Sequence, residues 1–375
     1  MKIINGLVFR GKHGFAKETL YVENGRFSDS SSDETILDAE GCYVIPGLID
    51  IHFHGCVGHD FSDASLDGLK EMAKYQLTQG VTSICPASMT LDPDTLKAIC
   101  DCGLAFSKIE SPDSSRLVGI NLEGPFISYA KRGAQNADYI HQADFALLEE
   151  LQNHAEGLVK LVTLAPETNG AMDFIRQVKN SDLKDISISI GHTESGYETA
   201  MEAFQAGADH VTHLFNAMPA FTHREPGVIG AAFDTKACYS EVICDGIHIS
   251  PSVIRAAFAM FGDQRIVLIS DSMRATGLSD GMYTLGGQEV QVTGNRAVLV
   301  DGTLAGSVTP LLDCMRHAVS MGIPLENAVT CATTNPARSI GIENLYGSLD
   351  TGKVADFLLL DQNLNLKHVH KAENH

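Results

Sequence analysis

The chain has 375 residues, of which 44% are hydrophobic and 20% are charged, as is usual for a globular protein with room for one large and one small domain. Its formal net charge of −20 argues against nucleic acid and anionic membranes as partners. No apolar run approaches the roughly 20 residues that a membrane-spanning helix needs. An anionic substrate would therefore have to meet a local cluster of basic groups.

The cysteine content and the opening residues indicate a reducing compartment. The nine cysteines are scattered and form no Cys-x-x-Cys pair. The opening segment MKIINGLVFRGKHGF has neither a long apolar core nor a small-residue cleavage site. We therefore expect a cytoplasmic protein with reduced cysteines.

The first predicted elements are short strands in residues 1–46. The segments KIINGLVF, TLYVENGRFS and ETILDAEGCYVIPG alternate apolar and polar residues, and Asn24 with Gly25 is a hairpin signal. The segment YGSLDTGKVADFLLLD near the other end has a similar pattern. Neither end has enough strands for a stable sheet by itself. We expect residues 1–46 and 345–375 to pair into one small β-sandwich domain, with residues 47–344 inserted between them.

Residues 47–344 alternate between short apolar runs and segments of helical period. Eight runs have the composition of buried strands: GLIDIH, TSICPAS, RLVGINLE, KLVTLAPE, ISISIGH, HVTHLFN, YSEVICDG and RIVLISD. Helical segments lie between most of them, such as ESGYETAMEAFQAGA, in which Gly207 is a stop signal. Eight alternating strands and helices predict an α/β fold, a (β/α)8 TIM-like barrel.

Residue types that bind metals recur at the ends of these predicted strands. His52 and His54 end the first run, and they would share one face because side chains alternate along a strand. Alone, this pair also fits a solvated strand end. Later runs end in, or are followed by, further such residues: Glu123, His192, His213, His248 and Asp271. Because the carboxyl ends of barrel strands share one rim, we expect a metal site there.

The chemistry of this set is coherent. Neutral imidazoles and carboxylates suit zinc, iron or manganese, and no cysteine falls on the rim. Glu123 is central enough to bridge two ions. Asp271 on the last strand could accept a proton from water and pass it to a leaving group. After the sixth strand, Arg224 offers a planar fork suited to phosphate, while the alternative is a surface arginine paired with Glu225.

Several motifs resemble those of a known superfamily. PGLIDIHFHG and GKVADFLLLD resemble the amidohydrolase superfamily. The segments LEGPF, GHTES, THLFNAMPAFTHREPGVIG, DGIHISP, ISDSMRATG, LAGS and TTNPAR closely resemble its deacetylases of phosphorylated amino sugars. The resemblance runs almost from end to end, and its most specific part is the run from His213 to Gly230.

The resemblance implies roles for individual residues. Its metal ligands fall on Glu123, His192 and His213, with His52 and His54 as the extra pair of two-metal relatives. Asp271 matches the catalytic carboxylate, which can also touch the metal on the first-strand side. The implied substrate-binding set comprises Asn216 and Ala217 in the loop that holds the sugar phosphate, Arg224 and His248 as its basic partners, and Gln135 where some relatives carry a histidine near the acetyl carbonyl.

The same resemblance implies an enzyme that hydrolyses the acetamide of N-acetyl-D-glucosamine 6-phosphate to D-glucosamine 6-phosphate and acetate. One or two divalent ions are implied, Zn²⁺ first, with Fe²⁺, Mn²⁺ or Co²⁺ as alternatives, and we expect a homodimer. A sister enzyme acting on N-acetylgalactosamine 6-phosphate or another amide is the alternative function. A non-catalytic binding protein would be expected to lose ligands, whereas Glu123, His192, His213 and Asp271 are all present.

Overall fold

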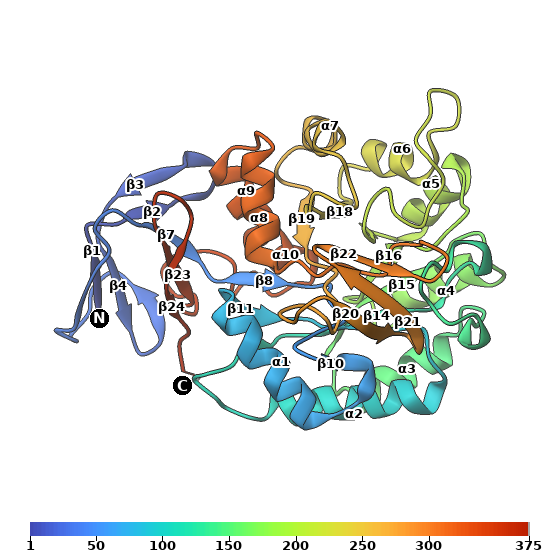
Figure 1. The fold of residues 1–375 in the computed structure, drawn as a ribbon, viewed down its shortest axis with the longest axis horizontal. Coiled ribbons are helices and arrows are strands. Elements are labelled where there is room, and N and C mark those ends of the chain that lie inside the picture. Colours follow the sequence, from blue (N-terminus) through green and yellow to red (C-terminus); the bar gives the residue numbers. More distant parts are fainter. Residues whose placement is uncertain (374–375) are drawn as a thin grey trace.

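The eight apolar runs form the strands of a TIM-like barrel in the computed structural model, which describes residues 1–373 (Figure 1). Neighbouring strands pair in parallel and follow the order of the chain. The second and third runs are each divided into two strands. The bounds are β8 (Leu48–Asp50), β11 (Val81–Ile84) with β12 (Ala87–Ser88), β13 (Arg116–Leu117) with β14 (Ile120–Phe126), β15 (Val159–Leu164), β16 (Ser187–Ile190), β17 (His210–Val211), β18 (Tyr239–Ile243) and β19 (Ile266–Ile269).

Contacts between the last strand and the first bring the two ends of the barrel together. The N–H of Asp271 donates to the carbonyl oxygen of His52 at 2.9 Å. The hydroxyl of Ser270 donates to the carboxylate of Asp50 at 2.5 Å. β16 and β19 are buried at every position, and β19 accordingly has the continuous apolar sequence IVLI, whereas β16 alternates small serines with isoleucines.

Helices follow the barrel strands and cover the sheet. Asp92 caps α2 by accepting the N–H of Thr95 at 3.0 Å, and α5 ends at Gly207, whose φ is +122°. The bounds are α1 (Leu66–Thr78), α2 (Pro93–Ser107), α3 (Phe145–His154), α4 (Ala171–Lys179), α5 (Tyr197–Ala206), α6 (Gly227–Asp234), α7 (Pro251–Phe261), α8 (Leu311–Ser320), α9 (Leu325–Ala332) and α10 (Thr334–Ser339). Within residues 1–373, none of the helices combines the length and the apolar character that crossing a bilayer requires.

The two ends of the chain form two sheets beside the barrel, at the left of Figure 1. One sheet has the strand order β5-β4-β1-β6, and the other has the order β24-β23-β7-β2-β3. The antiparallel pairing of β23 with β7 joins the late residues to the early ones, as expected. The bounds are β1 (Lys2–Ile4), β2 (Leu7–Phe9), β3 (Phe15–Lys17), β4 (Leu20–Glu23), β5 (Arg26–Ser28), β6 (Ile36–Asp38), β7 (Tyr43–Pro46), β23 (Phe357–Leu360) and β24 (Leu366–His370). We propose that these sheets are a separate domain with the boundaries given above.

A three-stranded antiparallel sheet was not predicted as a separate unit. It comprises β20 (Gly281–Leu285), β21 (Gln288–Thr293) and β22 (Arg296–Leu299), inserted between β19 and α8. The turn between β20 and β21 contains Gly286 and Gly287, both with positive φ. The sheet has an apolar cluster of its own, which includes Leu285, Val290 and Met273. It therefore packs as a unit on the barrel instead of extending it.

Candidate metal centre and cavity

The metal-type residues converge where the barrel strands end. His52 and His54 follow β8, Glu123 lies in β14, and His192, His213 and Asp271 follow β16, β17 and β19. All six side chains are buried. They form two groups whose ligand atoms lie within 4.8 Å of one another: a first triad of His52, His54 and Asp271, and a second triad of Glu123, His192 and His213.

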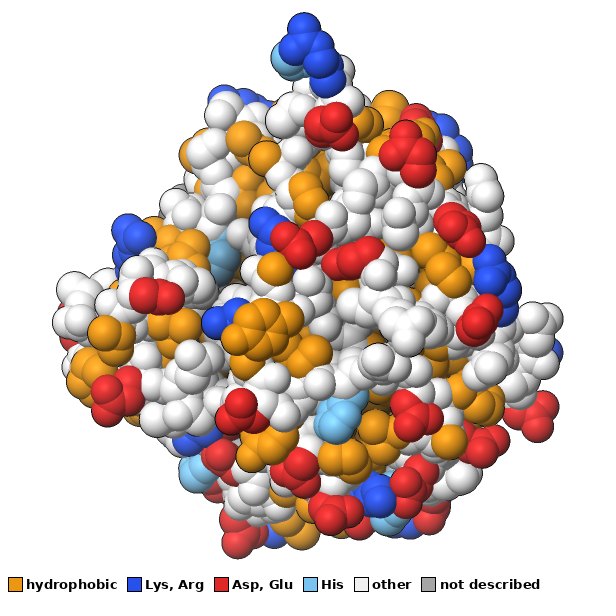
Figure 2. Space-filling view, turned by 90° about the vertical axis from the view of Figure 1, so that its right-hand side faces the viewer, with side chains coloured by type: hydrophobic (Ala, Val, Ile, Leu, Met, Phe, Trp, Pro, Cys, Tyr) orange, Lys and Arg blue, Asp and Glu red, His pale blue; other side chains and the backbone are white. Residues whose placement is uncertain are grey.

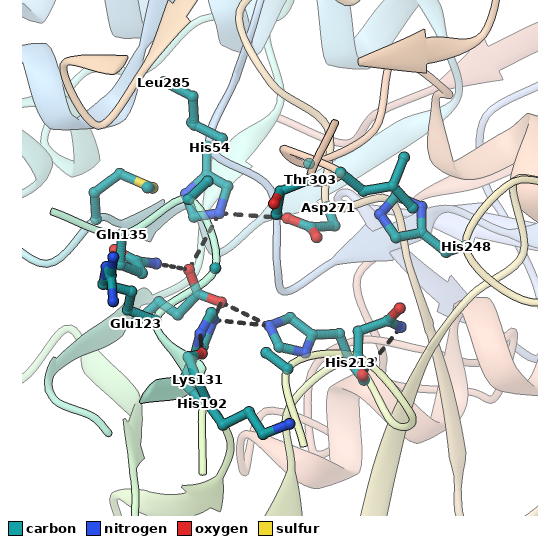
Figure 3. A pocket seen from close by; sticks show the side chains of 18 of the residues that line it. His54, Glu123, Lys131, Gln135, His192, His213, His248, Asp271, Leu285 and Thr303 are labelled. Atoms are coloured by element: carbon teal, nitrogen blue, oxygen red, sulfur yellow. Dashed lines mark hydrogen bonds and ion pairs between the residues drawn. The ribbon is translucent and has the colours of Figure 1, made fainter. Parts of the chain in front are cut away.

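Glu123 lies between the two triads. Its Oε1 is 3.0 Å from Nε2 of His213 and 3.1 Å from Nε2 of His192, and the same oxygen is 3.3 Å from Nε2 of His52. Its Oε2 is 3.3 Å from Nε2 of His54 (Figure 3). One carboxylate therefore faces four imidazoles, which suits a ligand shared by two cations.

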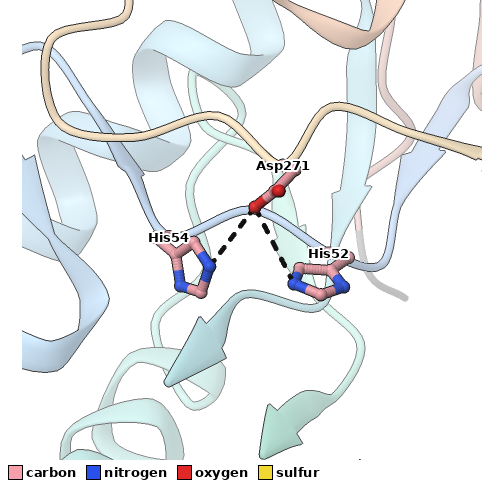
Figure 4. Close-up of side chains that lie close together, drawn as sticks. All are labelled: His52, His54 and Asp271. Carbon is pink, nitrogen blue, oxygen red and sulfur yellow. Dashed lines mark ion pairs between the residues drawn. The ribbon is translucent and has the colours of Figure 1, made fainter. Parts of the chain in front are cut away.

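Asp271 completes the first triad from the opposite side. Its Oδ1 is 3.3 Å from Nε2 of His54 and 3.9 Å from Nε2 of His52, as Figure 4 shows. The two histidines of the HFH motif thus point toward one acceptor, although both lie beyond the end of β8 rather than within the strand. The solvated alternative is wrong for this pair, since His52 and His54 are 0% and 3% exposed.

The ring orientations fit a divalent cation. In the second triad, Nδ1 of His192 is 2.8 Å from the carbonyl oxygen of Lys131, so this nitrogen carries the hydrogen and Nε2 offers a lone pair. That Nε2 is only 3.1 Å from Nε2 of His213. In the first triad, Nε2 of His52 is buried without a hydrogen bond to any other described residue. Imidazole nitrogens and carboxylate oxygens arranged in this way are ligands for zinc, iron, manganese or cobalt.

Three ligands have a backbone conformation that is rare for their residue type. The φ angles of His192, His213 and Asp271 are +46°, +27° and +47°. A non-glycine residue in this region costs of the order of 1–3 kcal/mol and persists where the surrounding structure holds it. Each of the three is the second residue after the end of a barrel strand. The strain therefore coincides with the turns that aim these side chains inward.

Burial and mutual contact shift the pKa values of the ligands. Burial raises the pKa of Glu123, but His52 and His192 outweigh it and hold this pKa well below its usual range. Burial also raises the pKa of Asp271, whereas the contacts with His54 and His52 bring it below the ordinary value. Burial lowers the pKa of His54, and its contacts with Asp271 and Glu123 raise it to about 10. The carboxylates are therefore ionised at neutral pH, and a cation competes with protons for the imidazoles.

Glu241 was not among the predicted residues, yet it contacts both triads. Its side chain is completely buried in β18, with Oε2 2.8 Å from Nδ1 of His52. The same oxygen accepts the backbone N–H of His213 at 3.0 Å, and Oε1 is 3.3 Å from Nε2 of His210. The available signal was a glutamate within the predicted buried strand YSEVI, because an ionised side chain is rarely buried without a partner.

His248 is held at the edge of the site by a second residue that was not predicted. Its Nδ1 is 2.6 Å from Oδ2 of Asp245, and Oδ1 of Asp245 accepts the backbone N–H groups of Ile247 and His248. Burial lowers the pKa of His248, but Asp245 outweighs it and raises this pKa. The Asp-Gly-x-His segment is thus a small rigid turn that presents one imidazole.

A cavity of about 470 Å³ opens above the triads. Its lining contains most of the predicted residues: His54, Glu123, Gln135, His192, His213, Asn216, Ala217, His248 and Asp271. His52 lies outside this lining. The lining also contains Lys131, Arg132 and Thr303, which were not predicted. Lys131 and Arg132 are the local basic groups that an anionic substrate would need in a chain with so large a negative charge.

Arg224 lies outside this cavity. It is exposed, on the loop between β17 and α6, which extends outward at the upper right of Figure 1. Glu225 is also exposed, and its backbone carbonyl oxygen accepts the hydroxyl of Thr222 at 3.3 Å in a turn at the tip of the loop. Acidic and basic side chains are interspersed on the face shown in Figure 2, which is not an extended basic surface. The role of Arg224 in phosphate binding stays a prediction.

The sequence matches one described family over most of its length. The amidohydrolase family model matches residues 43–374. The chain belongs to this family. The TIM-like barrel is thus the fold that the resemblance implied, while the roles of the individual strand-end residues stay predictions.

Several similar proteins share one more specific name than that of the family. The N-acetylglucosamine-6-phosphate deacetylase of Bacillus subtilis is 39% identical, over 84% of this chain and 80% of the relative. The protein of that name from Bos taurus is 36% identical, over 96% and 88%. Among solved structures, a mutant of the Mycobacterium smegmatis deacetylase in complex with N-acetyl-D-glucosamine-6-phosphate has a TM-score of 0.91 and 30% identity, covering 99% of this chain and 97% of that one.

Proposed function

We propose that the chain hydrolyses the acetamide of N-acetyl-D-glucosamine 6-phosphate to D-glucosamine 6-phosphate and acetate. The observation that carries this proposal is the pair of buried triads that share Glu123 beneath a cavity lined by Lys131 and Arg132. The names of the similar deacetylases support the same substrate. A homodimer in the cytoplasm is part of the proposal.

The two triads would hold one or two divalent cations, with Zn²⁺ first and Fe²⁺, Mn²⁺ or Co²⁺ as alternatives. When bound, such a cation acidifies a water molecule and polarises the amide carbonyl as a Lewis acid. His52, His54 and Asp271 would provide one set of ligands, and Glu123, His192 and His213 the other. The protein itself supplies the orientation of the rings, through Glu241, the carbonyl of Lys131 and the carbonyl of Ala87.

Asp271 would move the proton. Its carboxylate lines the cavity beside His54, so it can accept a proton from the attacking water. As the carbon–oxygen bond forms and the carbon–nitrogen bond breaks, the same carboxyl group returns this proton to the departing amine. The products are then a free amine and acetic acid, which ionises to acetate by releasing its proton to solvent, and Asp271 is again ionised.

Gln135 would position the reacting groups without titrating. Its Oε1 accepts the backbone N–H of Thr90 at 2.6 Å, and its Nε2 donates to Glu123. One N–H of this amide remains to reach a substrate oxygen in the cavity. His248, fixed by Asp245, faces the site from the opposite side and could donate to the carbonyl or to the sugar.

The phosphosugar would extend away from the triads toward Asn216, Ala217 and the basic rim. Binding the phosphate away from the triads would hold the amide over them. The reaction would then take place within one bound complex and would not depend on a chance encounter. Arg224 is a proposed phosphate contact from the outer loop.

The decisive experiment is hydrolysis of N-acetyl-D-glucosamine 6-phosphate, followed by the release of acetate and of the free amine. Chelation should abolish activity, and zinc, iron, manganese or cobalt should restore it to different degrees. The 6-phosphate of N-acetylgalactosamine and unphosphorylated N-acetylglucosamine serve as comparison substrates. Full activity in rigorously metal-free protein, or a preference for an unphosphorylated amide, would contradict the proposal.

A further inference from the structure

Part of the cavity lining is apolar. Met89, Ala134 and Leu285 line the cavity and are 1%, 8% and 2% exposed. They belong to the apolar cluster that attaches the β20–β22 sheet to the barrel. We refer to these three residues as the apolar wall.

The apolar wall is adjacent to the reacting end of the cavity. Ala134 precedes Gln135, whose Nε2 donates to Glu123. Met89 precedes Thr90, whose N–H donates to Oε1 of Gln135 at 2.6 Å. Figure 3 shows Leu285 beside His54, with Gln135 on that side and His248 on the other. In this view Leu285 and Gln135 thus lie on one side of Asp271, and His248 lies on the other.

The apolar wall is held in place by the hairpin that carries Leu285. Nε2 of Gln288 donates to the carbonyl oxygen of Ala134 at 2.6 Å. A Cβ placed on Gly286 would lie 3.0 Å from Cε of Met89 and 3.2 Å from that carbonyl oxygen, so the hairpin tip is closely packed. The positive φ of Gly286, +56°, also favours glycine at this point. A longer group in the cavity could not displace the apolar wall without breaking these contacts.

We propose that the apolar wall receives the methyl group of the acetyl moiety and limits the length of the acyl chain that the enzyme removes. The carbonyl carbon of the amide is bonded to the methyl group on one side. On the other side it is bonded to the nitrogen, which carries the sugar. When the carbonyl lies over the triads and the sugar extends toward His248, the methyl points toward Leu285. The inference rests on the proposed function and specifies its acyl group.

The test is a series of N-acylated glucosamine 6-phosphates with formyl, acetyl, propionyl and butyryl groups. For the wild type, kcat/KM should fall steeply beyond acetyl, because one methylene in a closed apolar pocket changes kcat/KM by roughly 10–200-fold. Leu285→Ala should raise the ratio of butyryl to acetyl activity by at least about 10-fold. Ala134→Val should act in the opposite direction and lower the ratio of acetyl to formyl activity.

The controls separate the apolar wall from its supporting cluster. Val290→Ala removes volume from the same cluster, but Val290 does not line the cavity. The ratio of butyryl to acetyl activity of this variant should therefore match that of the wild type. Met89→Ala is a second opening variant if Leu285→Ala fails to fold. Equal ratios in wild type, Leu285→Ala and Met89→Ala would overturn the inference and leave the deacetylase function intact. Failure of the wild type to cleave the acetyl compound would overturn the proposed function itself.

Discussion

Glu241 connects the two triads of the candidate metal site, one through a side chain and the other through the backbone. It accepts a hydrogen bond from the ring of His52, which belongs to the first triad, and from the backbone of His213, which belongs to the second. Holding Nδ1 of His52 directs Nε2 toward Glu123 and Asp271. Because Glu241 is completely buried, its charge must be balanced inside the protein. It is a positioning residue, since it acts through the histidines.

The first prediction concerns this positioning. Glu241→Gln keeps the size of the side chain but removes the charge that orients His52, so metal affinity should fall by about 10–100-fold. The measurement is a competition titration against a chelator of known affinity. Glu198→Gln, at an exposed site in the first turn of α5, is the matched control and should bind metal like the wild type. Equal affinities in both variants would mean that Glu241 only fills space.

The second prediction concerns proton transfer by Asp271. Asp271→Asn retains the shape of the side chain but cannot accept a proton. It should lower kcat by at least about 10²-fold, the usual scale of general acid–base catalysis. Substrate should still bind, as a thermal shift with N-acetyl-D-glucosamine 6-phosphate would report. A variant that retains wild-type kcat would exclude Asp271 as the base.

At the scale of elements, the loop between β17 and α6 raises the question of how the phosphate is recognised. Arg224 lies on this exposed loop, whereas Lys131 and Arg132 line the cavity directly. Arg132 also packs over the ring of Tyr129, with its guanidinium carbon 4.4 Å from the ring centroid. The cavity thus has basic groups of its own, and the contribution of the loop can be measured separately.

The third prediction tests that loop. Arg224→Ala should lower kcat/KM for the 6-phosphate by roughly 1.5–3 kcal/mol, the worth of a charge-assisted hydrogen bond. Activity on unphosphorylated N-acetylglucosamine should hardly change. Arg176→Ala, at an exposed position on α4, controls for the loss of one positive charge. If Arg224→Ala weakens both substrates equally, Arg224 has a structural role and does not contact the phosphate.

The fourth prediction concerns β24, at the late end of the chain. The ring of His370 stacks on Phe357, with centroids 4.8 Å apart, and burial together with His368 lowers its pKa to about 4. Between pH 6.5 and 4 the unfolded chain therefore binds more protons than the folded one. The stability that comes from burying neutral His370 is complete above pH 6.5 and is lost as the pH falls through this window. The loss should be of the order of 2 kcal/mol. Urea unfolding at pH 7 and pH 4.5 should show a smaller acid effect in His370→Phe, and an equal effect would contradict the assignment.

The elements also show which features could be predicted from the sequence. The barrel strands were predictable because most are short apolar runs, and the convergence of the candidate ligands was predictable because they lie at the ends of those runs. The β20–β22 sheet was missed although GMYTLGGQEVQV alternates and has a Gly-Gly turn, because eight strands already completed the barrel. Glu241 and the carbonyl of Lys131 were missed for a different reason. Their partners are far away in the sequence, and a backbone carbonyl leaves no residue-type signal.

At the scale of the whole molecule, the barrel gathers ionised side chains at one end. The buried carboxylates of Glu123, Asp271 and Glu241 contact histidines, and none of their hydrogen bonds or ion pairs within residues 1–373 involves a lysine or an arginine. The charge of this cluster is therefore balanced by protons on the imidazoles or by a cation. The first triad joins residues that follow β8 and β19, and the second joins residues in or after β14, β16 and β17, so an ion in either triad would tie separate barrel strands together.

The last prediction follows from this coupling between the metal and the fold. A ligand that binds only the folded state stabilises it by RT ln(1 + [L]/Kd), about 2.7 kcal/mol at a concentration 100 times Kd. Removing the metal should therefore lower the Tm by several degrees, and zinc should restore it.

Under metal-replete conditions the wild type should carry close to two ions per chain. His52→Ala combined with His54→Ala should carry about one, because the second triad remains, and zinc should raise its Tm less than that of the wild type. If elemental analysis never finds more than one ion in the wild type, the first triad does not bind metal, and the HFH pair would serve to orient Glu123 and Asp271.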